Sequence, residues 1–297
     1  MNSARLLVVF FCGFHSLANA VSLPPIPGER YEIGDYSLHI QCLGEGEPTV
    51  IMDVGLGDDS SDWQTLLKQS SQTTRSCVYD RAGYGWSDYG PRPRTSRRIA
   101  YELHLLLNAA HISPPYILVG HSFGGYNMRL FANFYPKSVV GLILVESSHE
   151  LQYDRLHIKL PAPYKGRRNI IISQPSPPAS DSANAKPQAL RDHAFRTAGY
   201  EISGLYTSSR QLQLNGSIPT IPLIVISRGM PEWEGNEKLR QREKIWIELQ
   251  QDLTRLSPYS RHLFANHSGH NIPQDEPEII IDAISDVISQ VKLLEEQ

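Results

Sequence analysis

The sequence has few cysteines and, beyond its first twenty residues, no long apolar run. Only three of its 297 residues are cysteine, and no group of possible ligands has the spacing of a zinc site. A glycine-rich phosphate-binding loop and an internal repeat are also lacking. The formal net charge of −3 provides no general excess of basic side chains, which disfavours nucleic acid as a partner. The composition, 40% hydrophobic and 20% charged, is typical of a globular protein.

The long apolar run lies at the N-terminus. Arg5 precedes the apolar residues 6–14, and Ala18-Asn-Ala20 has the pattern of a cleavage site. This layout predicts a secretory signal peptide over residues 1–20, with an uncleaved anchor as the alternative. The run is too short for a stop-transfer helix. We therefore expect a mature chain of residues 21–297 that is exported, either to a periplasm or by secretion, and has no stable membrane span.

Two cysteines, Cys42 and Cys77, remain after the predicted cleavage. In an oxidising compartment an even pair is a candidate disulfide. Two buried thiols in core strands are the alternative, and the residues alone leave both open.

Apolar strand patterns alternate with amphipathic helix patterns along most of the chain. Strands are predicted at 31–43 (a hairpin), 49–54, 75–79, 117–119, 139–145, 221–227 and 261–266. Helices are predicted from about 63, and at 96–110, 126–135, 237–256 and 277–294. This alternation predicts an α/β fold with a mostly parallel central sheet of about eight strands and helices on both faces.

The alternation is interrupted between about residues 148 and 219. This segment is rich in proline and contains a low-complexity patch at 177–186, with helical stretches predicted at 187–199 and 200–213. We interpret residues 148–219 as a lid inserted over the sheet.

The pentapeptide Gly120-His-Ser-Phe-Gly124 connects a predicted strand to a predicted helix. A Gly-x-Ser-x-Gly sequence in that context is typical of a nucleophile elbow, in which Ser122 is at a tight, strained turn. The alternative is a glycine-rich turn with an ordinary serine.

A serine hydroxyl becomes a good nucleophile only when a base accepts its proton. His270, in Ser268-Gly-His270 after the last predicted strand, is in the position that such a base requires. His267 is the nearest alternative.

With these motifs together, the chain resembles the α/β-hydrolase superfamily over nearly all of residues 30–297. The resemblance is carried by Gly120-His-Ser-Phe-Gly124, the loop Tyr79–Asp88, Gly55-Leu-Gly57 followed by Trp63, and Ser268-Gly-His270 followed by Asp275–Glu278. It implies an oxyanion hole made by the backbone N–H groups of Phe123 and Leu56, and it implies no metal or organic cofactor. It also implies structural roles for Asp80 and Arg81. Val54-Gly55 stands where most relatives have His-Gly, but main-chain donors tolerate that change.

The resemblance leaves the third member of the triad open. The usual loop, after strand 221–227, has no Asp but contains Glu232. Glu146 directly follows strand 139–145, where some relatives place their acid, and we favour it over Glu232. The resemblance also makes the strands of Cys42 and Cys77 neighbours, which favours the disulfide.

The sequence thus predicts an exported serine hydrolase that cleaves a carboxylic ester, or an amide, of a small to medium-sized substrate through an acyl-enzyme on Ser122. One alternative is an aminopeptidase of the proline-iminopeptidase type. Another is a non-catalytic binding protein of the same fold. The acyl group, the leaving group and the oligomeric state are not indicated.

Overall fold

A computed structural model describes residues 26–160 and 188–296. The predicted signal peptide and the centre of the predicted lid lie outside the described residues. The described strands are β1 (Glu29–Glu32), β2 (Ser37–Leu43), β3 (Thr49–Asp53), β4 (Ser76–Tyr79), β5 (Tyr116–His121), β6 (Val139–Val145), β7 (Leu223–Arg228) and β8 (Ser260–Ala265). The α-helices are α1 (Gln64–Ser70), α2 (Ser96–Ala109), α3 (Phe123–Phe134), α4 (Gln152–Arg155), α5 (Gln188–Asn215), α6 (Glu237–Leu253), α7 (Ile272–Asp275) and α8 (Pro277–Glu295). Short 3₁₀ turns occur at Ser60–Trp63, Pro136–Ser138 and Thr254–Leu256.

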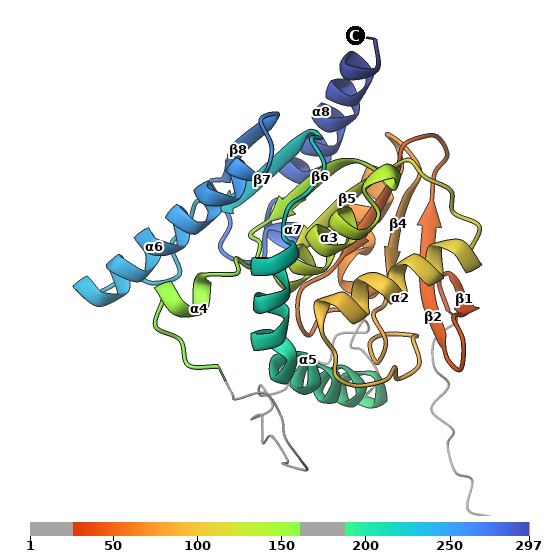
Figure 1. Cartoon of the computed structure of the whole chain (residues 1–297), viewed down its shortest axis with the longest axis horizontal. Helices are drawn as coiled ribbons and strands as arrows, with labels where there is room; N and C mark the ends of the chain where they lie inside the picture. The colour runs from red at the N-terminus through yellow and green to blue at the C-terminus, as the bar shows by residue number, and fades with distance from the viewer. Residues whose placement is uncertain (1–25, 161–187, 297) are drawn as a thin grey trace, which may run out of the picture.

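The strands form one eight-stranded sheet in the order β1-β2-β4-β3-β5-β6-β7-β8. β1 pairs antiparallel with β2 and β2 with β4, and the remaining neighbours are parallel. The predicted fold class, a mostly parallel sheet with helices on both faces, is confirmed (Figure 1).

Alternating side chains along the central strands point into two separate apolar cores. On β3, Ile51 belongs to one core, while Val50 and Met52 belong to the other. The first core is covered by α2 and α3, and the second by α1 and α8. Burial on both faces explains why these strands are almost continuously apolar in the sequence.

The order of the strands reverses between β3 and β5. After β3 the chain adds β4 on one side, and it then returns to add β5 on the other side. Loops diverge at such a switch point and leave a crevice beyond the carboxyl ends of the strands. The loop after β3 and the turn after β5 therefore lie at the same end of the sheet, on either side of this switch point.

Three local expectations are corrected. The two helices predicted at 187–199 and 200–213 are the single element α5, which packs against α2 and α3 and changes direction along its length (Figure 1). The segment between the predicted strand 261–266 and the predicted helix 277–294 contains the helical turn α7, which starts beside Pro273. α4 is likewise a helical turn in a segment without a helical pattern.

Cys42 and Cys77 are register partners on the paired strands β2 and β4, and their sulfur atoms are bonded. The predicted disulfide is confirmed. The helices in the described part of the chain include none that is both apolar and long enough to cross a bilayer.

Candidate functional site

Ser122 lies at the turn between β5 and α3. Its backbone has φ 51° and ψ −119°, a conformation that a residue with a side chain rarely adopts. Hydrogen bonds hold it there, because the Ser122 N–H donates to Val145 O and the Ser122 carbonyl accepts from the N–H groups of Gly125 and Ser148. A strained turn that is fixed on both sides presents its side chain in one defined direction.

Gly124 of the motif and the following Gly125 are required by close packing. A Cβ atom on Gly124 would lie 2.2 Å from the backbone oxygen of Asp53, and one on Gly125 would lie 1.9 Å from Ser147 Oγ. α3 can therefore approach β3 and the end of β6 only without side chains at these positions.

His270 lies in the segment between β8 and α7, with its side chain 38% exposed. Its backbone is fixed on both sides: the N–H donates to Glu232 Oε1 at 3.1 Å, and the carbonyl accepts from His121 Nε2 at 2.9 Å. The rings of His121 and His270 are in contact, with centroids 4.9 Å apart. Since His121 directly precedes Ser122, this contact joins the nucleophile turn to the histidine loop. The alternative base, His267, is exposed and its N–H donates to Glu276.

Glu146 follows β6 and is fully buried, with a positive φ of 44°. Its Oε1 atom lies 3.7 Å from His270 Nδ1. That separation is within range of an ion pair and longer than a hydrogen bond. Catalytic contacts of this kind are often long without substrate and shorten in the substrate complex. Glu232, by comparison, is exposed and contacts the backbone of His270.

Arg228 and Trp246 hold the Glu146 carboxylate. Oε1 accepts from Arg228 Nη1 and from Trp246 Nε1, and Oε2 accepts from the Arg228 N–H at 2.9 Å. The Arg228 guanidinium contacts the rings of Trp233 and Trp246, with its carbon 5.1 and 5.2 Å from their centroids, and it also pairs with Glu243. Neither Arg228 nor Trp246 is predicted from the sequence, because neither belongs to a motif and Trp246 is 100 residues from Glu146.

These contacts determine the charge of the acid. Burial alone would raise the pKa of Glu146, but the nearby His270 and the charge and N–H of Arg228 outweigh burial and lower it. Glu146 is therefore ionised at neutral pH. For His121, burial and then the charge of His270 lower the pKa to about 3, so its ring is neutral. A neutral ring donates from Nε2 to the His270 carbonyl and keeps a lone pair on Nδ1.

The two predicted oxyanion donors lie on either side of the switch point. Phe123 is the first residue of α3, where backbone N–H groups point out of the helix. Leu56 lies in the loop after β3 and is partly buried against the first core. Main-chain donors at a helix N-terminus favour negative charge. Within the described residues, no cluster of His, Cys, Asp and Glu could hold a metal ion.

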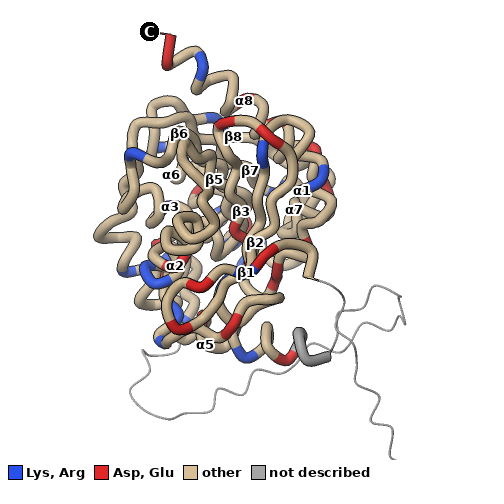
Figure 2. Tube along the Cα trace, turned by 90° about the vertical axis from the view of Figure 1, so that its right-hand side faces the viewer, with Lys and Arg blue, Asp and Glu red and all other residues tan. Residues whose placement is uncertain are grey.

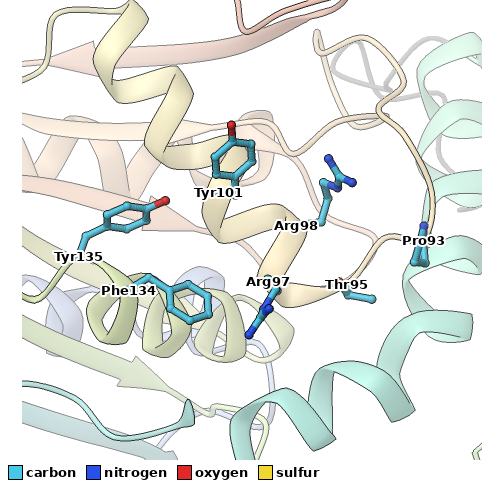
Figure 3. A pocket seen from close by; sticks show the side chains of 7 residues that line it. All are labelled: Pro93, Thr95, Arg97, Arg98, Tyr101, Phe134 and Tyr135. Carbon is cyan, nitrogen blue, oxygen red and sulfur yellow. The ribbon is translucent and has the colours of Figure 1, made fainter. Parts of the chain in front are cut away.

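A hollow of about 520 Å³ lies elsewhere, between the start of α2 and the end of α3 (Figure 3). The predicted catalytic residues do not line it. There Arg97 extends over the ring of Phe134, with 5.3 Å between guanidinium carbon and ring centroid. Arg94, just before α2, is 1% exposed and forms two hydrogen bonds to Glu102.

Comparison with known proteins decides the family. A family model described as "alpha/beta hydrolase fold" matches residues 48–200, more than half of the chain. The chain belongs to the α/β-hydrolase fold family. The family supports a hydrolase as the general class of this protein.

Relatives and solved structures match this α/β hydrolase over most of its length. It is 28% identical to the uncharacterized protein YqjL of Bacillus subtilis strain 168, over 87% of this chain and 91% of that protein. A candidate lipase of Acinetobacter baumannii AYE superposes with a TM-score of 0.65 at 16% identity, covering 90% of this chain and 92% of the other. A thermophilic esterase of Thermogutta terrifontis superposes with a TM-score of 0.59 at 18% identity, covering 86% of this chain and 94% of the esterase. At these identities the structural likeness shows the fold.

Proposed function

We propose that this protein is an exported serine hydrolase that cleaves a small carboxylic ester, with an amide as the second substrate class. The observation that carries the proposal is the buried, ionised Glu146 within 3.7 Å of His270 Nδ1. His270 in turn contacts the histidine that precedes Ser122. The esterase among the structural neighbours is consistent with this choice of substrate.

In the proposed reaction Ser122 Oγ attacks the carbonyl carbon and passes its proton to His270. Glu146 holds the ring of His270 and stabilises the imidazolium that forms. His270 then donates the proton to the leaving alcohol, and an acyl-enzyme remains on Ser122. A water molecule, deprotonated by His270, then attacks the acyl carbon. The bond from that carbon to Ser122 Oγ breaks, His270 returns the proton to Oγ, and the carboxylic acid leaves. The N–H groups of Phe123 and Leu56 stabilise the negative oxygen of each tetrahedral intermediate.

A fluorophosphonate probe tests the nucleophile. The folded protein should be labelled at Ser122, and both Ser122→Ala and His270→Ala should abolish labelling while keeping the thermal unfolding temperature close to that of wild type. A panel of p-nitrophenyl esters of different chain lengths would then define the acyl group. An unlabelled but folded wild-type protein would indicate a non-catalytic binding protein instead.

Export is supported by the signal-like N-terminal segment and by the Cys42–Cys77 disulfide. Expression with the complete N-terminus in a secreting host should yield protein outside the cytoplasm that begins near Val21. Recovery of the intact chain from membranes would instead indicate an uncleaved anchor.

A further inference from the structure

The guanidinium of Arg81 is completely buried, and each of its five N–H groups can be assigned to a bond. Nη1 donates to Asp53 Oδ1 at 2.7 Å and to the Val54 carbonyl at 2.7 Å. Nη2 donates to the Gly55 carbonyl at 2.9 Å and to Glu201 Oε2 at 3.1 Å, and Nε donates to Glu201 Oε1 at 2.9 Å. A buried cation with every donor used is held in one orientation.

The same group fixes the loop that contains Leu56. Arg81 holds the two carbonyls before Leu56, and the Gly57 N–H after it donates to Tyr84 Oη at 3.3 Å. Tyr84 Oη in turn donates to Glu201 Oε2 at 2.8 Å. Burial first, and then the charge of Glu201, raise the pKa of Tyr84, so the hydroxyl keeps the proton that it donates.

Glu201 comes from α5, far from the loop in the sequence. α5 is tied to the segment after β4 a second time, since Thr197 Oγ1 donates to the Gly83 carbonyl at 2.9 Å. A side chain at Gly83 would overlap Thr197, because its Cβ would lie 2.1 Å from the hydroxyl. α5 therefore has a closely fitted position on the Asp80–Ser87 loop.

We propose that Glu201 is a positioning residue for the oxyanion hole: through Arg81 and Tyr84 it fixes the main chain on both sides of Leu56. α5 thereby takes part in catalysis without touching the substrate. This inference rests on the proposed function, because it assigns Leu56 N–H as an oxyanion donor. When Ser122 Oγ adds to the carbonyl carbon, the π electron pair moves to the oxygen, and the Leu56 N–H must already point to that oxygen.

The decisive comparison is between Glu201→Gln and Glu102→Gln. Both replace a buried acid that forms two hydrogen bonds to a buried arginine, but the Arg94–Glu102 pair does not contact the Leu56 loop. Complete loss of an oxyanion donor costs about 100- to 1000-fold in kcat, so a misplaced donor in Glu201→Gln should cost about 10- to 100-fold. KM should change less than about threefold, because the ground-state carbonyl needs the donor far less. Glu102→Gln should keep kcat within about twofold of wild type.

A trifluoromethyl ketone adds a readout that a purely structural role would not change. Its hemiketal with Ser122 carries the negative oxygen, so its affinity for Glu201→Gln should fall in parallel with kcat. Tyr84→Phe is a milder variant in case Glu201→Gln does not fold. It removes only the hydroxyl between Gly57 and Glu201 and should lower kcat about three- to tenfold.

Two results would overturn the inference: wild-type kcat in folded Glu201→Gln or Tyr84→Phe, or equal losses of kcat in Glu201→Gln and Glu102→Gln. Wild-type protein that neither reacts with fluorophosphonate nor hydrolyses esters would instead refute the proposed function itself, and the inference with it.

Discussion

At the residue scale, the proposed acid shows how one side chain is prepared for its role. Glu146 has a positive φ and lies in a site without solvent contact, and both features are unfavourable for an isolated glutamate. Donors from Arg228 and Trp246 satisfy both carboxylate oxygens. The position of Glu146 beside His270 is thus maintained by groups outside the triad.

Replacing each candidate acid by its amide distinguishes Glu146 from Glu232. Glu146→Gln should lower kcat/KM at least about 100-fold, because a neutral amide cannot stabilise the imidazolium of His270. The kcat/KM of Glu232→Gln should stay within about threefold of the wild-type value, because an amide oxygen can still accept the hydrogen bond from the His270 backbone N–H. Steady-state ester hydrolysis at neutral pH measures both. Near wild-type activity in Glu146→Gln with a collapse in Glu232→Gln would reverse the assignment.

Arg228 should be sensitive even to the charge-conserving change to lysine. Lysine cannot reproduce the forked contact to Glu146 and Glu243 or the contacts of the guanidinium with two tryptophan rings. We expect kcat/KM of Arg228→Lys to fall about tenfold. Arg240→Lys is the matched control, because that arginine is in an exposed pair with Glu237 and should keep full activity. Equal activity of the two variants would show that Arg228 does not support the acid.

At the scale of elements, the contact between α3 and β3 depends on a missing side chain. In Gly124→Ala the new Cβ would meet the Asp53 carbonyl, which is backbone and cannot rotate away. We expect the free energy of unfolding to fall by about 3 kcal/mol, measured by urea denaturation. Gly269→Ala serves as the control, because its nearest neighbour would be Glu232 Oε1 at 3.7 Å. A stable Gly124→Ala would mean that α3 can move away without cost.

An ion pair joins α3 to the segment after β6 and makes stability depend on pH. Burial opposes ionisation of Glu150, but two hydrogen bonds from Arg129 and its charge outweigh burial and lower the pKa to about 2. Because the pKa is lower in the folded state, the stabilisation is complete above the unfolded pKa near 4.5. This stabilisation is lost as the pH falls from the unfolded pKa through the folded pKa of about 2.

Glu150→Gln removes this contribution. The difference in unfolding free energy between wild type and Glu150→Gln should shrink by about 2 kcal/mol between pH 5 and pH 3, as followed by urea unfolding. Glu248→Gln, in an exposed pair with Arg155, should show little change with pH. If the difference in unfolding free energy between wild type and Glu150→Gln were the same at pH 5 and pH 3, it would contradict the lowered pKa of Glu150.

At the scale of the whole molecule, charge is mixed rather than divided. Acidic and basic positions are interspersed along the described chain, and both occur around α2 and α5 (Figure 2). In the sheet between the two cores, the bond between Cys42 and Cys77 joins β2 to β4, the second and third strands in the order of the sheet.

Reduction of that bond should destabilise the entire fold. The cross-linked residues are 35 positions apart in the sequence. In the chain-entropy description, such a cross-link lowers the entropy of the unfolded chain and thereby stabilises the fold by about 4 kcal/mol. A reductant should therefore lower the unfolding free energy of wild type by several kcal/mol, measured in urea. The double variant Cys42→Ala/Cys77→Ala should be insensitive to reductant. An equal response of both proteins would show that the bond does not contribute.

The sequence by itself determined the features that depend on local pattern. Strand positions follow from short apolar runs, and the prediction of Ser122 as a nucleophile follows from glycines that a tight turn needs next to it. His270 was located by its place after the last strand. The disulfide does not follow from local pattern: the residues alone left it open, and the family resemblance favoured it by making the two strands neighbours.

Only the tertiary structure decided which distant side chains meet. Arg81 and Glu201 are 120 residues apart, and Trp246 reaches Glu146 across 100 residues. No periodic pattern encodes such contacts, because burial and orientation of these polar groups arise only when separate elements pack. From the sequence, Arg81 is therefore expected to have only a structural role, whereas its contacts extend from α5 to the loop of Leu56.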